Sequence, residues 1–170
     1  MVAMDGFSGT SSAAGSYCGG PSPSLHRWEL AMRRVQESAR SGQPQQAERT
    51  ARAALQEAQG LLEHPSEGRE EDCVAAFVVS HHVLADLHAS EGAIETAAHL
   101  RCTAHERLLA LLADCPQGAA VQQAAWRHSR ATHSELLHHA AEHGVDPAIT
   151  QVLEAGCRAL LAAGSGPVPH

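Results

Sequence analysis

The sequence predicts an all-α protein made of three stacked antiparallel helical hairpins, and two observations lead to this prediction. Helix-favouring Ala, Leu, Glu, Gln and Arg dominate the middle of the 170-residue chain, whereas aromatic residues make up only 3% of it. Three glycines, Gly42, Gly92 and Gly144, lie 50 and 52 residues apart, and each stands between two stretches with helical periodicity. A repeat of this kind indicates supersecondary units that bury their apolar faces against their neighbours.

The first hairpin is expected within residues 24–63. Ser24 is a suitable N-cap, and Gly42 can adopt the left-handed conformation that ends the first helix. Pro44 fits the first turn of the second helix, where its missing N–H is not needed. Apolar residues then keep helical spacing until Pro65 interrupts the chain.

The second hairpin follows a charged connector with the sequence HPSEGREED. Its first helix is expected to run from Val74 to the turn at Gly92, because apolar residues recur at spacings of three and four. Its second helix begins at Ile94 and keeps the same spacing until Pro116 breaks the pattern.

The third hairpin begins with a long helix expected over Ala119–His143. Asp146 and Pro147 then form a suitable N-cap and first-turn pair for the last helix. The helical domain is therefore expected to cover residues 24–163.

Both ends of the chain are expected to lack fixed structure. Residues 1–23 are rich in Gly, Ser and Pro and carry almost no charge, so we expect a disordered tail there. Residues 164–170 are expected to form a flexible C-terminal tail. Residues 1–23 lack a basic start followed by an apolar stretch, and the longest apolar runs of the chain are too short to cross a bilayer. We therefore expect a cytoplasmic protein that does not use a membrane.

Composition argues against several classes of function. The formal net charge is −7 and the arginines are spread along the chain, so a nucleic-acid surface is not expected. Lys is absent, which excludes a Schiff-base lysine or the lysine of a phosphate loop. The five cysteines form no CxxC pair and are expected to be reduced thiols. Because no catalytic motif appears, we expect neither an enzyme nor a cofactor.

Small residues of the first two hairpins follow a recognisable pattern. They are Gly42, Ala47, Ala54, Ala85, Gly92, Ala97 and Ala104. Their arrangement resembles tetratricopeptide (TPR) repeats, in which small residues let the two helices of a hairpin approach closely. His88 and Arg101 stand where that family has aromatic residues, and the repeat is longer than the roughly 34 residues typical of the family.

The segment from Cys73 to Ala163 also resembles a small group of uncharacterised bacterial TPR-like proteins. The stretches that carry this resemblance are VVSHHVLADLHASEG and LLADCPQ. The resemblance implies a TPR-like superhelix and a role in holding other proteins, as an adaptor or a chaperone-like module.

The same resemblance implies a binding groove. In the register of the repeat, Val79, His82, Asp86 and Ala89 face the concave surface on which such folds bind an extended peptide or a helix. His82 and Asp86 are four residues apart, so they share a helix face and can form a hydrogen-bonded pair; the alternative is a solvent-facing pair without a role in binding. The expected partner is therefore another protein, with a homodimer formed through an apolar face as a further alternative.

Five other side chains suggest a different function, which is metal binding. They are His99, Cys102, His105, His139 and His143. The first three are expected on the outward face of their helix, where one ion would reach only two of them. His139 and His143 are four residues apart, with Glu135 one turn earlier. We keep a metal-binding or metal-responsive protein as the alternative to an adaptor.

Overall fold

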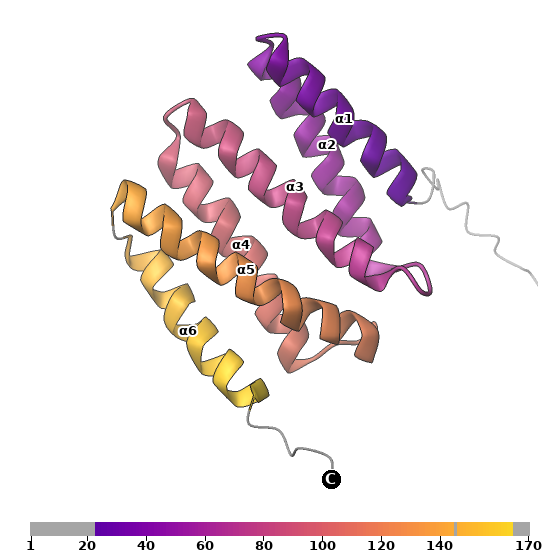
Figure 1. Cartoon of the computed structure of the whole chain (residues 1–170), viewed down its shortest axis with the longest axis vertical. Helices are drawn as coiled ribbons and strands as arrows, with labels where there is room; N and C mark the ends of the chain where they lie inside the picture. Colours follow the sequence, from indigo (N-terminus) through magenta and orange to yellow (C-terminus); the bar gives the residue numbers. More distant parts are fainter. Residues whose placement is uncertain (1–22, 145, 165–170) are drawn as a thin grey trace, which may run out of the picture.

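The computed structural model describes residues 23–144 and 146–164, in which six α-helices pack as consecutive antiparallel pairs (Figure 1). The helices are α1 (Leu25–Arg40), α2 (Pro44–Glu63), α3 (Glu70–Ser90), α4 (Ile94–Ala113), α5 (Ala119–His143) and α6 (Pro147–Gly164). The prediction of an all-α fold of three hairpins is confirmed. The tails expected at 1–23 and 164–170 lie outside the described residues, apart from residues 23 and 164.

Local sequence explains where the helices begin and end. The side chain of Ser24 caps α1 by accepting a hydrogen bond of 3.2 Å from a backbone N–H three residues later. Gly42 and Gly92 follow α1 and α3 with φ angles of 65° and 81°, which favour glycine. Asp146 accepts a bond of 2.7 Å from the backbone N–H of Ala148 at the start of α6.

One predicted boundary was wrong. Helix α3 begins at Glu70, inside the segment expected to be a charged connector. Its first turn carries Glu70, Glu71 and Asp72. Carboxylates are favourable there because the unpaired N–H groups and the helix dipole place positive charge at a helix N-terminus.

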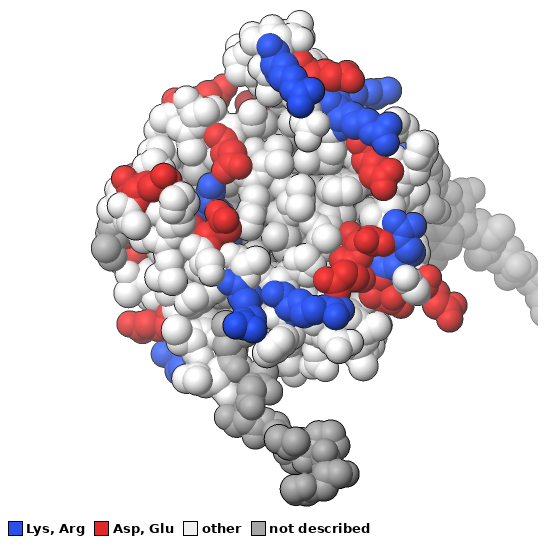
Figure 2. Space-filling model, viewed as in Figure 1, with Lys and Arg blue, Asp and Glu red and all other residues white. Residues whose placement is uncertain are grey.

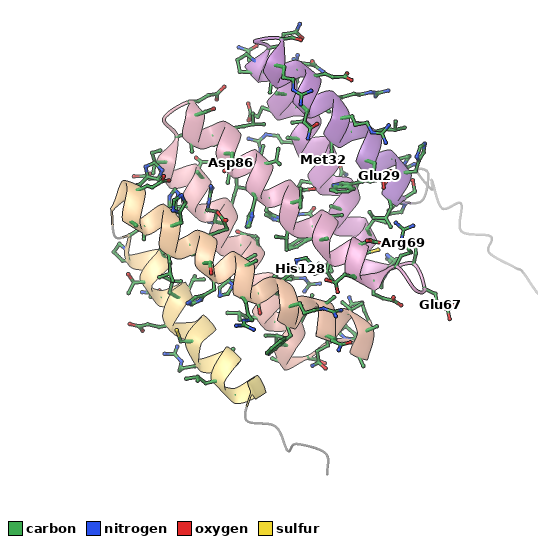
Figure 3. All side chains as sticks on the ribbon, viewed as in Figure 1. Glu29, Met32, Glu67, Arg69, Asp86 and His128 are labelled. Carbon is green, nitrogen blue, oxygen red and sulfur yellow. The ribbon has the colours of Figure 1, made fainter. Side chains whose placement is uncertain are left out.

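The hairpins stack so that the first helix of each lies beside the first helix of the next. Helix α1 contacts α3 and α3 contacts α5, while α4 contacts α6 in the second layer (Figure 1). We call the surface that α1, α3 and α5 present to the viewer in Figures 1–3 the first-helix face. The indole N–H of Trp28 in α1 donates a 2.8 Å hydrogen bond to Ser80 Oγ in α3, which ties the first two hairpins together.

Small residues hold the helices close together. A stripe on α2 is almost completely buried against α1 and α3, and its members are Ala47, Ala51, Ala54 and Ala58. A larger apolar cluster joins α2 to α5 and includes Leu62, Val74, Phe77, Val78, Leu108, Leu111 and Val121. Because interiors of this kind are close-packed, added volume in the alanine stripe must displace a neighbouring helix.

Helix α3 is also long and apolar enough to cross a membrane, judged by length and composition alone. It is the one such helix among the residues that the structure describes. Half of its apolar window is buried inside the domain, and it contacts α1, α2, α4 and α5. Such burial is typical of the core helix of a folded domain.

We expect the alanine stripe to tolerate no larger side chain. Ala54→Leu adds volume at a position with 0% exposure, so the free energy of unfolding should fall by about 1–3 kcal/mol. The neighbouring Ala53 is exposed, and Ala53→Leu should change stability by less than about 0.5 kcal/mol. Urea unfolding of both variants measures this, and equal effects would contradict the close packing of α2.

Candidate functional site

The four side chains predicted to bind a partner lie along α3. Val79 is 41% exposed although it is apolar, Asp86 is exposed, and His82 and Ala89 are half-buried. Asp86 is labelled on the first-helix face in Figure 3. Val79 lies seven residues before it, which is two helical turns, so both occupy the same side of α3.

Asp86 does not pair with His82 as the sequence suggested. Its carboxylate instead accepts a 2.6 Å hydrogen bond from Arg101 Nη2, which reaches it from α4. Only 9% of Arg101 is exposed, so this ion pair lies at the boundary between the interior and the first-helix face. In the sequence Arg101 stands out only as a replacement for an aromatic residue, because its contact depends on how α4 packs against α3.

Buried nitrogen atoms around this ion pair lack hydrogen-bond partners among the described residues. Arg101 Nε and Nη1 and His82 Nε2 are buried and make no hydrogen bond among the described residues. The pKa of His82 is lowered mainly by burial and also by the positive Arg101, while Glu135 and Asp86 act in the opposite direction. His82 is therefore held in its neutral form next to a buried guanidinium.

The first-helix face has an uncharged centre. In Figure 2 the middle of this face is white, and acidic and basic side chains lie around it. Met32, labelled on α1 in Figure 3, is buried beside this centre, and Val79 is the large apolar residue that α3 exposes. A centre depleted of charged residues with a polar rim is the usual arrangement of a protein–protein contact surface.

A second ionic contact connects α3 and α5 at the other end of this face. Glu71 Oε2 accepts a 2.5 Å hydrogen bond from Arg127 Nη2, and Glu71 Oε1 lies 2.9 Å from His128 Nε2. Glu71 lies in the first turn of α3, whereas Asp86, labelled in Figure 3, lies near its other end. The two ionic contacts therefore hold both ends of α3 against its neighbours.

The residues proposed for metal binding on α4 do not share an outward surface. His99 is exposed, but Cys102 is only 6% exposed and His105 is completely buried, so the expected outward position was wrong for these two. Cys102 packs in an apolar cluster with Leu136 and Ile149, and burial raises the pKa of its thiol to about 11. A buried thiol of this kind is a poor metal ligand.

His105 takes part in a buried polar chain. Its Nδ1 lies 2.7 Å from Thr132 Oγ1, and its Nε2 lies 3.4 Å from Nδ1 of His133, a half-buried residue of α5. Helix α6 covers this chain at Gly156, where an added Cβ would stand 2.5 Å from His105 Nε2. The sequence pattern does not indicate this connection, because its members come from different helices.

His139 and His143 lie together in the wall of a different cavity. Their rings are 4.6 Å apart, and the cavity of about 300 Å3 is also lined by Glu95 and Asp146. Glu135, expected to accompany them, instead lies near His82. Within the described part of the chain, no group of three or more His, Cys, Asp or Glu side chains is arranged to hold a metal ion. Metal binding therefore stays a prediction without a supporting geometry.

Fold and site together define an all-α protein of consecutive antiparallel hairpins. Its first-helix face has an uncharged centre surrounded by charged side chains. The chain belongs to DUF2753, a family described as a protein of unknown function, whose model matches residues 26–163. This match covers the six helices almost completely. No curated protein and no solved structure matches the chain.

Buried histidines make stability depend on pH. Burial lowers the pKa of His105 to about 4, with nearby His133 acting in the same direction, and burial also lowers the pKa values of His81, His82 and His139. The unfolded chain then binds protons that the folded chain does not. The free energy of unfolding is therefore not reduced by these groups above about pH 6.5. It falls as the pH falls from about 6.5 towards 4, because the unfolded chain takes up protons in that range.

We expect His105 alone to account for about 3 kcal/mol of this loss at most, since its folded pKa is about 4. Urea unfolding at pH 7.5 and pH 4.5 should show the difference, and His105→Gln should make it smaller. His99 is exposed, so His99→Gln is the matched control and should leave the pH dependence unchanged. The same pH dependence in wild type and His105→Gln would show that His105 is not the group responsible.

Proposed function

We propose that this protein is a non-enzymatic adaptor or chaperone-like module that binds a partner protein through the first-helix face. The observation that carries the proposal is the exposed Val79, which lies midway along α3 on the same side as Asp86, on a face whose middle is uncharged in Figure 2. Residues at the centre of a contact surface usually contribute most of the binding energy, while the rim mainly excludes water. The partner is a peptide or helix with an apolar side chain that covers Val79.

The resemblance to TPR repeats supports this proposal. The small residues on which the resemblance rests are buried between helices, with 0% exposure at Ala47, Ala54, Ala97 and Ala104. In such repeats the first helices of the hairpins line the binding surface. A TPR-like superhelix with its binding surface on α1, α3 and α5 is therefore part of the proposal.

The ion pair next to Val79 would orient the partner. Asp86 is 66% exposed at its side chain, and its bond to Arg101 holds it in one position. A fixed carboxylate can accept a hydrogen bond from the partner without first losing conformational freedom. His82 lies between Val79 and Asp86 along α3 and is neutral, so it adds no charge to the centre of the face.

The proposed partner is neither nucleic acid nor a membrane, and the proposed location is the cytoplasm. The net charge of −7 gives no excess of positive charge for phosphate contacts.

A homodimer is a second arrangement, because Leu137 and Leu161 of the last hairpin are 52% and 71% exposed. Sedimentation at several protein concentrations measures it, and Leu137→Arg should shift any dimer towards monomer.

We expect binding to depend on Val79 but not on the opposite layer. A photo-crosslinking residue at position 79 should form a discrete adduct in cells of the source organism, whereas the same residue at position 110 should not. Ala110 is an exposed small apolar residue of α4, which makes it the matched control. Mass spectrometry of the adducts identifies the partner.

The identified partner then permits a quantitative test. Val79→Arg should weaken its binding by at least about tenfold, or about 1.4 kcal/mol, since loss of a central hot-spot contact costs about 2 kcal/mol or more. Ala110→Arg should leave the affinity unchanged, and circular dichroism checks that both variants are folded. The His82→Ala, Asp86→Arg double variant should also lose the partner. If it is folded and retains every partner of the wild type, the first-helix face is not the binding surface.

A further inference from the structure

A chain of polar side chains runs from the interior to the surface where α4, α5 and α6 meet. Its atoms are Ser129 O, Thr132 Oγ1, His105 Nδ1 and Nε2, His133 Nδ1 and Nε2, and Cys157 Sγ. Ser129, Thr132 and His105 are at most 1% exposed, His133 is half-buried and Cys157 is exposed. None of these side chains belongs to the α3 site on the first-helix face.

The hydrogen bonds of this chain determine which nitrogen of each imidazole ring carries the proton. Thr132 Oγ1 donates to the carbonyl oxygen of Ser129 at 3.1 Å, so it must accept from His105 Nδ1 at 2.7 Å. His105 Nε2 then carries the lone pair and accepts from His133 Nδ1 at 3.4 Å. The free lone pair of His133 is left on Nε2.

The thiol of Cys157 lies against that lone pair. Its Sγ is 3.8 Å from His133 Nε2, within reach of an S–H···N hydrogen bond. A nucleophile beside a base, with a third group that orients the base, is the arrangement that activates side chains for covalent chemistry. His105 and Thr132 are the positioning residues here, because they act on Cys157 only through His133.

Helix α6 is held in position for this contact by Gly156. An ideal Cβ at that residue would lie 2.5 Å from His105 Nε2 and 3.0 Å from His133 Nδ1. Glycine therefore lets the backbone of α6 rest directly on both imidazole rings, and the next residue, Cys157, reaches the far nitrogen of His133.

We propose that Cys157 is a reactive thiol that forms a mixed disulfide with small disulfide molecules, with His133 as the acceptor of its proton. The Cys157 sulfur attacks one sulfur of the disulfide R–S–S–R, a new S–S bond forms and the old one breaks. The proton passes from Cys157 through His133 to the departing thiolate. The products are the mixed disulfide and one thiol R–SH, so Cys157 is oxidised while the departing sulfur is reduced.

The other described cysteines provide controls within the same molecule. Cys73 and Cys102 are buried. Cys115 is half-buried, and its thiol donates a hydrogen bond of 3.4 Å to the carbonyl oxygen of Gly118; no histidine of the described residues bonds to it. Cys115 is therefore a partly accessible thiol without a neighbouring base.

The test uses the full chain with Cys18→Ser, because Cys18 lies outside the described residues. Oxidised glutathione is added in the presence of EDTA, and mass spectrometry follows modification at each cysteine. At pH 7 we expect Cys157 to react at least about tenfold faster than Cys115 and about tenfold faster than Cys157 in the His133→Gln variant.

The pH dependence of the modification rate at Cys157 tests the role of His133 separately from the accessibility of the thiol. An ordinary thiol loses about tenfold in rate for each unit below its pKa, since only the thiolate reacts. With His133 as proton acceptor, the rate at Cys157 should fall much less between pH 8 and pH 7. Thr132→Val should restore the steeper dependence at Cys157 and leave Cys115 unchanged.

Two results would overturn the proposal. One is a rate at Cys157 of the folded wild type no higher than that of the same thiol in the urea-unfolded chain. The other is a rate at pH 7 that His133→Gln leaves unchanged. The wild-type comparison requires no substitution in the polar chain, so it stands even if a variant fails to fold.

Discussion

The close approach of neighbouring helices through alanine and glycine is the constraint on which the rest of the structure depends. The stripe on α2, from Ala47 to Ala58, lets α1 and α3 pack closely against α2. Gly156 does the same for α6 on α4 and α5. Where helices approach this closely, polar side chains from adjacent helices meet inside the domain, as His105 of α4 and Thr132 of α5 do.

The buried histidines follow from this constraint. His81 donates from Nδ1 to the carbonyl oxygen of Phe77 at 2.9 Å, and His105 bonds to Thr132 across two helices. A buried ring costs free energy unless its nitrogens are hydrogen-bonded, and it is cheaper to bury neutral than charged. Two of the histidines proposed as metal ligands, His105 and His139, are therefore buried core residues, and His105 links the second hairpin to the third.

Helix α5 connects the two sites that we propose. On one side of α5, His128 and Glu135 lie towards α3. On another side, Thr132 contacts α4 and His133 contacts α6. A helix that packs on several neighbours cannot rotate without disturbing all of them. The partner-binding face and the thiol at Cys157 are chemically independent, but both depend on α5 holding its position in the third hairpin.

The sequence by itself determined the number of helices and most of their ends, because capping, periodicity and left-handed glycines are properties of a few neighbouring residues. The sequence did not predict the start of α3 at Glu70, because the many charged residues of that segment indicated a connector. Only the tertiary structure decided that Asp86 pairs with Arg101, and that His105 is buried beside His133. Each residue along a helix turns by about 100°, so small differences in helix rotation choose which side chains of different helices meet.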